Sequence, residues 1–184
     1  MWLRSWIALI VCIIPIAGSA TVLVPAEFRE IVTGADIIAY GRVVETTVEW
    51  SDDRKRVDTL VTMQIGTYLK GGRGDRLVFK VPGGTIGRYM NVTVGAPHFT
   101  EGDEAVVFLN VRGTDLPYVF GLNQGVFRVT LDSQTKRRIV TAPVMARGDA
   151  PEAVARGAAA RRPVPLETFG AEVQNVLAAA RSAR

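Results

Sequence analysis

Two stretches decide the fold of this chain: IIAYGRVVETTVEW at residues 37–50 and VDTLVTMQIGTYLK at residues 57–70. In both, apolar and β-branched side chains recur at every second position, which is the period of a half-buried β-strand. The polar sequence SDDRK at residues 51–55 lies between them and is typical of a hairpin turn. The sequence therefore predicts a hairpin whose strands far exceed the usual length of about five or six residues.

Strands of this length must coil or bend inside a small domain. Gly41 and Gly66 lie in mid-strand, where glycine permits a bulge or a sharp bend. The alternation also assigns faces. In the first strand one face carries Ile38, Tyr40, Val44, Val48 and Trp50. In the second, one face carries Val57, Thr59, Val61, Met63, Ile65, Thr67 and Leu69.

Further short strands follow, separated by glycine-rich turns. They are expected at Arg76–Val81, Arg88–Val94, Glu104–Val111, Tyr118–Leu122, Val126–Leu131 and Arg138–Thr141. The strand from Glu104 is apolar on both faces in its middle, so we expect it to be the most buried. Seven or eight antiparallel strands with short turns predict a mostly β fold, a closed barrel or a sandwich.

Helices are expected at both ends of this β region. Residues 25–33 suit a short helix with Pro25 at its first position and Gly34 as its C-terminal cap. Phe28, Ile31 and Val32 would form its buried face. Residues 144–163 are rich in Ala, Arg, Pro and Gly and predict a flexible linker.

A C-terminal helix is expected at residues 164–182. Its narrow apolar stripe, which consists of Leu166, Phe169, Val173, Val176, Leu177 and Ala180, recurs at three-four spacing. The stripe favours packing back on the β domain over binding a separate partner.

Residues 1–20 have the order of a secretory signal peptide. Arg4 precedes an apolar run, and Pro15 and the small residues 17–20 follow it. We expect cleavage after Ala20 and a secreted or periplasmic protein. The alternatives are a membrane anchor, for which the run is short against about twenty residues, and a lipoprotein using Cys12, which lacks the small residue normally found before such a cysteine.

Composition bounds what remains after cleavage. Residues 21–143 form one β domain with a net charge of +1, and residues 144–184 add +2. A nearly neutral folded part argues against a nucleic-acid-binding face. The remaining chain has no cysteine, which excludes a thiol nucleophile and a cysteine-based zinc site. Frequent Ala, and Arg in preference to Lys, are typical of a GC-rich bacterial genome.

No catalytic or metal-binding pattern stands out, so we expect no enzyme and no cofactor. His98 is the single histidine and follows a loop signal, and no serine lies in a Gly-x-Ser-x-Gly elbow. Two acidic pairs, Asp52-Asp53 and Asp103-Glu104, lie beside turns. Neighbours in a strand point apart, so these acids are expected to be solvated rather than a catalytic dyad.

The best candidate for a functional loop is PGGTIGR at residues 82–88. Its glycines could bring backbone N–H groups close to a ligand, with Arg88 as an anion anchor. The candidate ligand-binding residues are Gly83, Gly84, Thr85 and Arg88, with Asn123 and Gln124 as further polar contacts. In both places a tight turn between strands explains the same residues and is favoured.

A resemblance adds to this interpretation. Residues 35–43, ADIIAYGRV, resemble the first long strand of netrin-like domains, which include the tissue inhibitors of metalloproteinases. Residues 62–71 look like their second strand, and Gly102-Asp103-Glu104 before residues 106–109 also matches. The resemblance implies a five-stranded barrel of the OB type with packed helices. Those inhibitors chelate zinc through an N-terminal cysteine, which the cleaved chain lacks, so that mechanism does not carry over. The chain is also similar in style to secreted bacterial proteins of unassigned function.

The expected function is a secreted or periplasmic, non-catalytic binding module. Its partner is expected to be a protein or another envelope component, with no nucleic acid and no stable membrane span after cleavage. The alternative is an oligosaccharide- or peptide-binding barrel using residues 84–88. A hydrolase is a third possibility and would need two acids and His98 around one pocket, whereas an exposed apolar surface would favour the interaction module.

Overall fold

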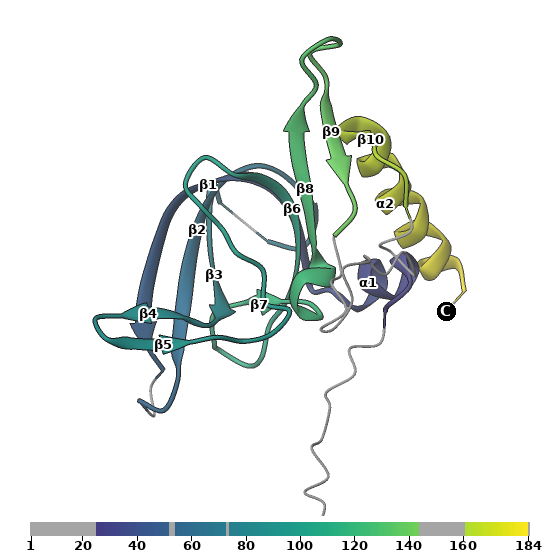
Figure 1. Ribbon diagram of the computed structural model, residues 1–184. Coiled ribbons are helices and arrows are strands. Elements are labelled where there is room, and N and C mark those ends of the chain that lie inside the picture. Colours follow the sequence, from purple (N-terminus) through teal and green to yellow (C-terminus); the bar gives the residue numbers. More distant parts are fainter. Residues whose placement is uncertain (1–24, 52–53, 73, 144–160, 184) are drawn as a thin grey trace, which may run out of the picture.

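The chain folds into a curved β structure with one helix at each end of the described sequence, seen in a computed structural model (Figure 1). The structure describes residues 25–51, 54–72, 74–143 and 161–183. The expected signal peptide and most of the expected linker lie outside these residues. The mostly β fold with a short N-terminal and a C-terminal helix is confirmed.

The helices and strands follow one another in a simple order. They are α1 (Phe28–Gly34), β1 (Ile37–Trp50), β2 (Val57–Lys70), β3 (Arg76–Pro82), β4 (Gly84–Ile86), β5 (Tyr89–Asn91), β6 (Glu104–Asn110), β7 (Tyr118–Val119), the 3₁₀ helix η2 (Leu122–Gly125), β8 (Val126–Leu131), β9 (Arg138–Thr141), β10 (Val164–Pro165) and α2 (Leu166–Ser182). The strand expected at 88–94 ends at Asn91, and that expected at 118–122 is the two-residue β7 followed by η2.

Strands β1 and β2 form the long antiparallel hairpin that the alternation predicts. Their register shifts at three points, and at each one strand carries one residue that has no partner on the other. Beyond such a residue, the side chains of that strand point to the opposite faces from those that strict alternation predicts. Gly66 is such a residue, because Tyr40 pairs with Thr67 and Gly41 with Ile65, so the bulge expected at Gly66 is confirmed.

Val44 is the unpaired residue at another shift, since Val43 pairs with Met63 and Glu45 with Thr62. Val43 is buried and Val44 is exposed. Beyond the shift, Val48 and Trp50 pair with Thr59 and Val57 and so lie on the face of Val43, opposite Ile38 and Tyr40. The predicted shared face of Ile38, Tyr40, Val44, Val48 and Trp50 is therefore wrong, because strict period-two counting does not see a bulge.

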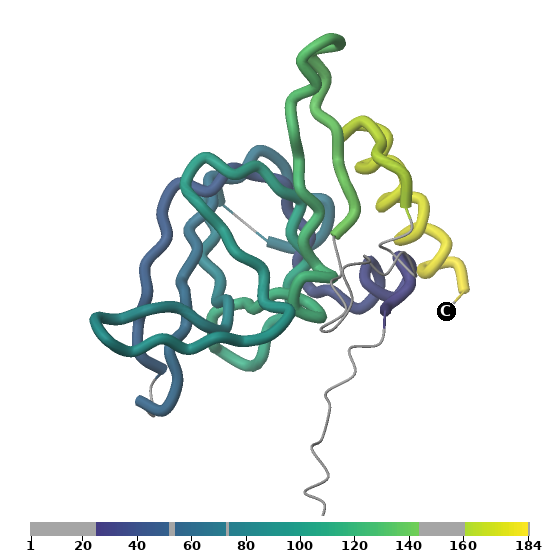
Figure 2. Tube along the Cα trace, in the orientation of Figure 1, coloured from purple at the N-terminus to yellow at the C-terminus, as the bar shows by residue number. Residues whose placement is uncertain are grey.

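The strands curl so that β1 has two neighbours. Strand β1 pairs with β2 on one side and with β6 on the other, and the sheet order runs β1-β2-β3-β7-β6-β8-β9-β10. All of these pairings are antiparallel except a single parallel contact between Lys80 of β3 and Tyr118 of β7. Figure 2 shows the trace of β1, β2 and β3 curving round, while the β8–β9 hairpin projects from them beside α2.

Strand β6 is buried on both faces, as its sequence predicts. Val107 and Leu109 lie in a core cluster with Val61, Met63 and Phe79, which come from β2 and β3. Its other face, with Val106 and Phe108, belongs to a second cluster that the helices cover.

Helix α1 packs the predicted residues Phe28, Ile31 and Val32 into this second cluster. It begins at Phe28 rather than at Pro25, and Glu27 and Glu30 form a capping box at its start. Gly34 is its last residue and Ala35 is the cap, so the cap position differs by one residue from the prediction. The Lys70 Nζ group at the end of β2 donates to the carbonyls of Val32, Thr33 and Ala35, which satisfies the C-terminal end of the helix.

Helix α2 packs on the same cluster with Phe169, Val173 and Leu177 buried. The Phe169 ring lies 5.0 Å from that of Phe127 and 5.5 Å from that of Phe28, measured between centroids. Helix α2 thus lies against the rest of its own chain (Figure 1), and its apolar face is buried there. No helix of the described residues has the length and apolar character that crossing a bilayer requires.

Candidate functional site

The glycines of the candidate loop are held by packing against the long hairpin. The Gly83 N–H donates to the Val57 carbonyl, and the Thr59 hydroxyl donates to the Gly83 carbonyl. A Cβ atom on Gly84 would lie 2.6 Å from Val48 Cγ1. These contacts give both glycines a structural role, while their binding role stays a prediction.

Thr85 and Arg88 lie on the exposed β4–β5 hairpin that follows these glycines. Asn123 and Gln124 lie in η2, where the Asn123 N–H donates to the Gly95 carbonyl. Gln124 is buried, and its Oε1 accepts a hydrogen bond of 2.6 Å from the Ala26 N–H. Gln124 therefore ties η2 to the chain before α1, a contact between residues 98 positions apart that sequence patterns do not reveal.

An aromatic hollow forms where the β4–β5 hairpin meets the end of the β1–β2 hairpin. We give this name to the open space of ≈ 690 Å³ lined by Trp50, Ser51, Arg54 and Tyr89. The Trp50 and Tyr89 rings meet edge to face, 5.4 Å apart between centroids, and are 37% and 52% exposed. The Arg88 guanidinium lies 5.4 Å from the Tyr89 ring centroid. Of these residues only Arg88 is singled out as a binding residue by the sequence, because the Trp50–Tyr89 contact joins distant strands.

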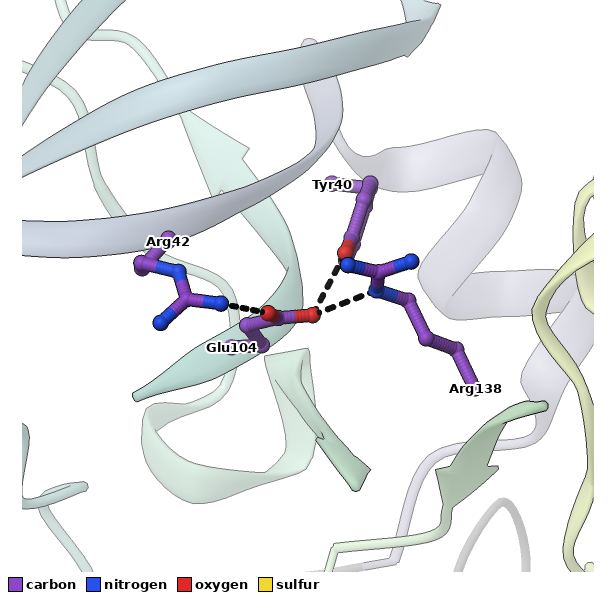
Figure 3. Close-up of polar contacts among 4 residues, drawn as sticks. All are labelled: Tyr40, Arg42, Glu104 and Arg138. Atoms are coloured by element: carbon purple, nitrogen blue, oxygen red, sulfur yellow. Dashed lines mark hydrogen bonds and ion pairs between the residues drawn. The ribbon is translucent and has the colours of Figure 1, made fainter. Parts of the chain in front are cut away.

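A polar cluster lies at the start of β6, on the edge of the face that the helices cover (Figure 3). Glu104 accepts hydrogen bonds from the Tyr40 hydroxyl at 2.5 Å and from Arg138 Nε at 2.9 Å, and it also pairs with Arg42. The Glu104 side chain is 14% exposed, whereas both arginines are about half exposed. One carboxylate thus joins β1, β6 and β9.

The environment of this cluster shifts its pKa values. Burial alone would raise the pKa of Glu104, but hydrogen bonds from Tyr40 and Arg138 and the charges of both arginines outweigh it and hold the pKa below its ordinary value. Burial and the hydrogen bond to Glu104 raise the pKa of Tyr40 to about 12. The carboxylate is therefore ionised and fully engaged at neutral pH, as in a structural clamp rather than a general acid.

The neighbouring Asp103 points elsewhere, as expected for adjacent residues in a strand. It accepts a hydrogen bond of 2.8 Å from Arg128 Nη1, while Arg128 also donates to the His98 carbonyl. The two acids do not form a dyad, but the expectation of freely solvated turn acids is wrong, because both are held in ion pairs.

His98 is exposed, and neither the aromatic hollow nor the smaller hollow beside α1 and α2 has a histidine or a carboxylate among its described lining residues. Within the described ranges, His, Cys, Asp and Glu side chains form no group of three or more placed to hold a metal ion. Asp52 and Asp53 lie outside the described residues.

Comparison with protein-family models, with curated proteins and with solved structures found no match. The resemblance of residues 35–111 to netrin-like domains stays an expectation from the sequence.

Proposed function

We propose that this chain is a secreted or periplasmic, non-catalytic binding module that engages a protein or another envelope component through the aromatic hollow. The proposal takes its location from the signal-like residues 1–20. It takes its binding site from the pairing of Trp50 with Tyr89 between two arginines.

That pairing is the observation that carries the proposal. Trp, Tyr and Arg are the residue types that most often dominate binding energy at interfaces, because they combine large apolar area with a polar group. Here two partly exposed rings support one another at a hollow instead of filling the core, and Arg54 and Arg88 flank them. Its described lining holds no histidine or carboxylate, and the Ser51 hydroxyl is engaged with the Arg56 backbone, so the lining has the composition of a contact site.

The position of the hollow on the fold gives further support. The strand pairing passes from β1 through β2, β3, β7 and β6 and returns to β1, which is the path of a five-stranded barrel, and we infer a barrel of the OB type. Barrels of that type commonly bind ligands at the loop between their first two strands and on the adjoining face. The hollow lies at the corresponding turn of this chain, after Trp50.

Oligosaccharide binding is the second candidate. Exposed aromatic rings offer flat apolar surfaces to a sugar ring, and arginine side chains offer hydrogen-bond donors to its hydroxyl or carboxylate groups. The same hollow would serve both occupants, so the chemical nature of the captured component distinguishes them.

The test places a photo-crosslinking amino acid at Thr85, next to the hollow, in the full chain expressed in its own cell envelope. The matched control carries it at Gln134, an exposed turn residue between β8 and β9. We expect one dominant adduct from position 85, weak or no adduct from 134, and loss of the adduct when Tyr89→Ala is added. Equal labelling at both positions, or an adduct that Tyr89→Ala leaves intact, would contradict the proposal.

A further inference from the structure

The chain after the tip of the β4–β5 hairpin has an inverted pattern of exposure. Met90, Val92 and Val94 are 72%, 73% and 85% exposed, whereas Asn91 and Thr93 between them are half-buried. The Thr93 side chain faces inward, because its Oγ1 would lie 3.9 Å from a Cβ on Gly83. Polar residues thus face the body of the molecule and apolar residues face water.

This alternation is the one that a half-buried strand shows towards its core. We call Met90, Val92 and Val94 the apolar stripe. Single exposed apolar residues are common on protein surfaces, whereas the largest contiguous apolar patch of a monomer is often functional. The stripe therefore has the pattern of a packed face whose covering layer is absent from the monomer.

We propose that a second copy of this chain covers the apolar stripe, in a two-fold, face-to-face contact. In such a contact the same row faces itself in the opposite direction, so Val92 meets Val92 of the other copy and Met90 meets Val94. The row Met90, Val92, Val94 places an apolar side chain opposite each apolar side chain when a second copy runs in the opposite direction, so it is complementary to itself.

The extent of the stripe fits a small, weak interface. Three side chains this exposed present about 400 Å² of apolar surface, within the range of the largest patch on an ordinary monomer. Two copies, with the polar rim around each stripe, reach the roughly 1,000 Å² at which specific interfaces begin. We therefore expect a weak, reversible dimer.

The charge balance of the sequence that follows Trp50 favours a self-complementary contact over a charged membrane surface. Residues 49–58 together with Arg88 carry four basic and four acidic residues. Such a balance gives no net attraction to anionic lipid, whereas mixed signs can pair across a two-fold axis. The stripe and the aromatic hollow have no residue in common, so the two proposals fail independently.

Sedimentation equilibrium of the secreted form tests the proposal first. We expect a monomer–dimer equilibrium, whose dissociation constant rises at least tenfold in the double variant Val92→Ser/Val94→Ser. Leu131→Ser is the matched control, because Leu131 is 63% exposed on the distant β8–β9 hairpin, and it should leave the constant unchanged. A wild-type protein that stays monomeric up to several hundred micromolar, or that grows beyond a dimer, overturns the proposal.

Disulfide crosslinking gives a second, independent measurement. The chain after residue 20 has no cysteine, so any disulfide that forms must involve the introduced cysteine. Under mild oxidation we expect Val92→Cys to form a covalent dimer at least fivefold faster than Leu131→Cys. Equal rates indicate random collision and overturn the proposal, as does a rate at Val92→Cys that falls on adding neutral or anionic lipid vesicles, which would assign the stripe to a membrane.

Discussion

Glu104 connects three strands through side-chain hydrogen bonds and ion pairs. It comes from β6, Tyr40 and Arg42 come from β1, and Arg138 comes from β9. A mostly buried carboxylate is tolerated here because charged donors satisfy both of its oxygens. Replacing the carboxylate by an amide would remove the charge that both guanidinium groups pair with and one of the two acceptor oxygens.

Stability should therefore depend on the ionised form of Glu104. Its pKa in the folded protein lies below the ordinary value, so the carboxylate stabilises the fold above the unfolded-state pKa, and this contribution is lost as the pH falls through the folded-state pKa. We predict that Glu104→Gln lowers the free energy of unfolding at pH 7 and flattens its decline below about pH 5. The measurement is the urea midpoint between pH 3 and 7.

Glu101→Gln serves as the control for this prediction, because Glu101 is an exposed turn residue, and it should leave the profile unchanged. Asp103 and Asp132 also have lowered pKa values and keep part of the acid dependence in both variants. If the urea midpoints of wild type and Glu104→Gln change with pH in parallel, the stabilising role assigned to the Glu104 carboxylate is contradicted.

Among the elements, the β3–β4 junction shows how far sequence patterns reach. The glycines of residues 82–88 correctly indicate an unusual backbone, since Gly83 and Gly84 have φ values of 107° and 148°. At Gly84 the reason is the approach of Val48 and Thr59 from the long hairpin, and at Gly83 it is the Asn91 carbonyl, which would lie 3.0 Å from a Cβ; only the folded chain reveals these neighbours. The aromatic hollow was not predictable for the same reason, because Trp50 and Tyr89 meet only once both hairpins have formed.

We predict that Gly84→Ala destabilises the protein by about 1–3 kcal/mol, since the new Cβ meets Val48 Cγ1 in a backbone conformation unfavourable to alanine. Gly87→Ala is the matched comparison: it also has positive φ, but open space surrounds it, so its cost should be smaller. Thermal or urea unfolding measures both. Equal losses would show that backbone conformation alone, without the packing contact, explains the glycine.

The two helices were predictable from three-four spacing and from terminal residues, and their positions differ from expectation by a few residues. Bulges were only partly predictable: glycine indicated the one at Gly66, whereas nothing in the alternation marked Val44. A bulge at a non-glycine residue depends on the register of the partner strand, so a single strand's sequence does not encode it alone.

Helix α2 should contribute to the stability of the whole domain. Phe169 fills the space between Phe28 and Phe127, so Phe169→Ala should cost about 3–5 kcal/mol. Glu167→Ala, at an exposed position on the same helix, should change stability by no more than about 0.5 kcal/mol. An unchanged unfolding midpoint for Phe169→Ala would mean that the helix does not pack on this core in solution.

For the whole molecule, two cores meet at β6. One lies among the curled strands and the other beneath the helices, and β6 supplies buried side chains to both. The residues of the β4–β5 hairpin that form the aromatic hollow and the apolar stripe belong to neither core. The outer surface there can change without loss of the fold, as a contact surface requires.

Export is a property of the whole chain, and we predict that it removes residues 1–20. Mass spectrometry of the protein from the periplasm or the medium should find Thr21, or a residue within a few positions, at the N-terminus. A product that retains Met1 and the apolar segment would contradict cleavage, and the proposed location with it.

The fluorescence of Trp50 tests the central claim most directly. Trp2 and Trp6 belong to the segment expected to be removed, so Trp50 is the single tryptophan of the cleaved chain. It is 37% exposed in the free protein, and binding at the aromatic hollow would cover it. We predict that the component captured at position 85 shifts its emission to shorter wavelength and lowers acrylamide quenching at least twofold. A complex that forms while Trp50 emission and quenching stay unchanged would contradict the account.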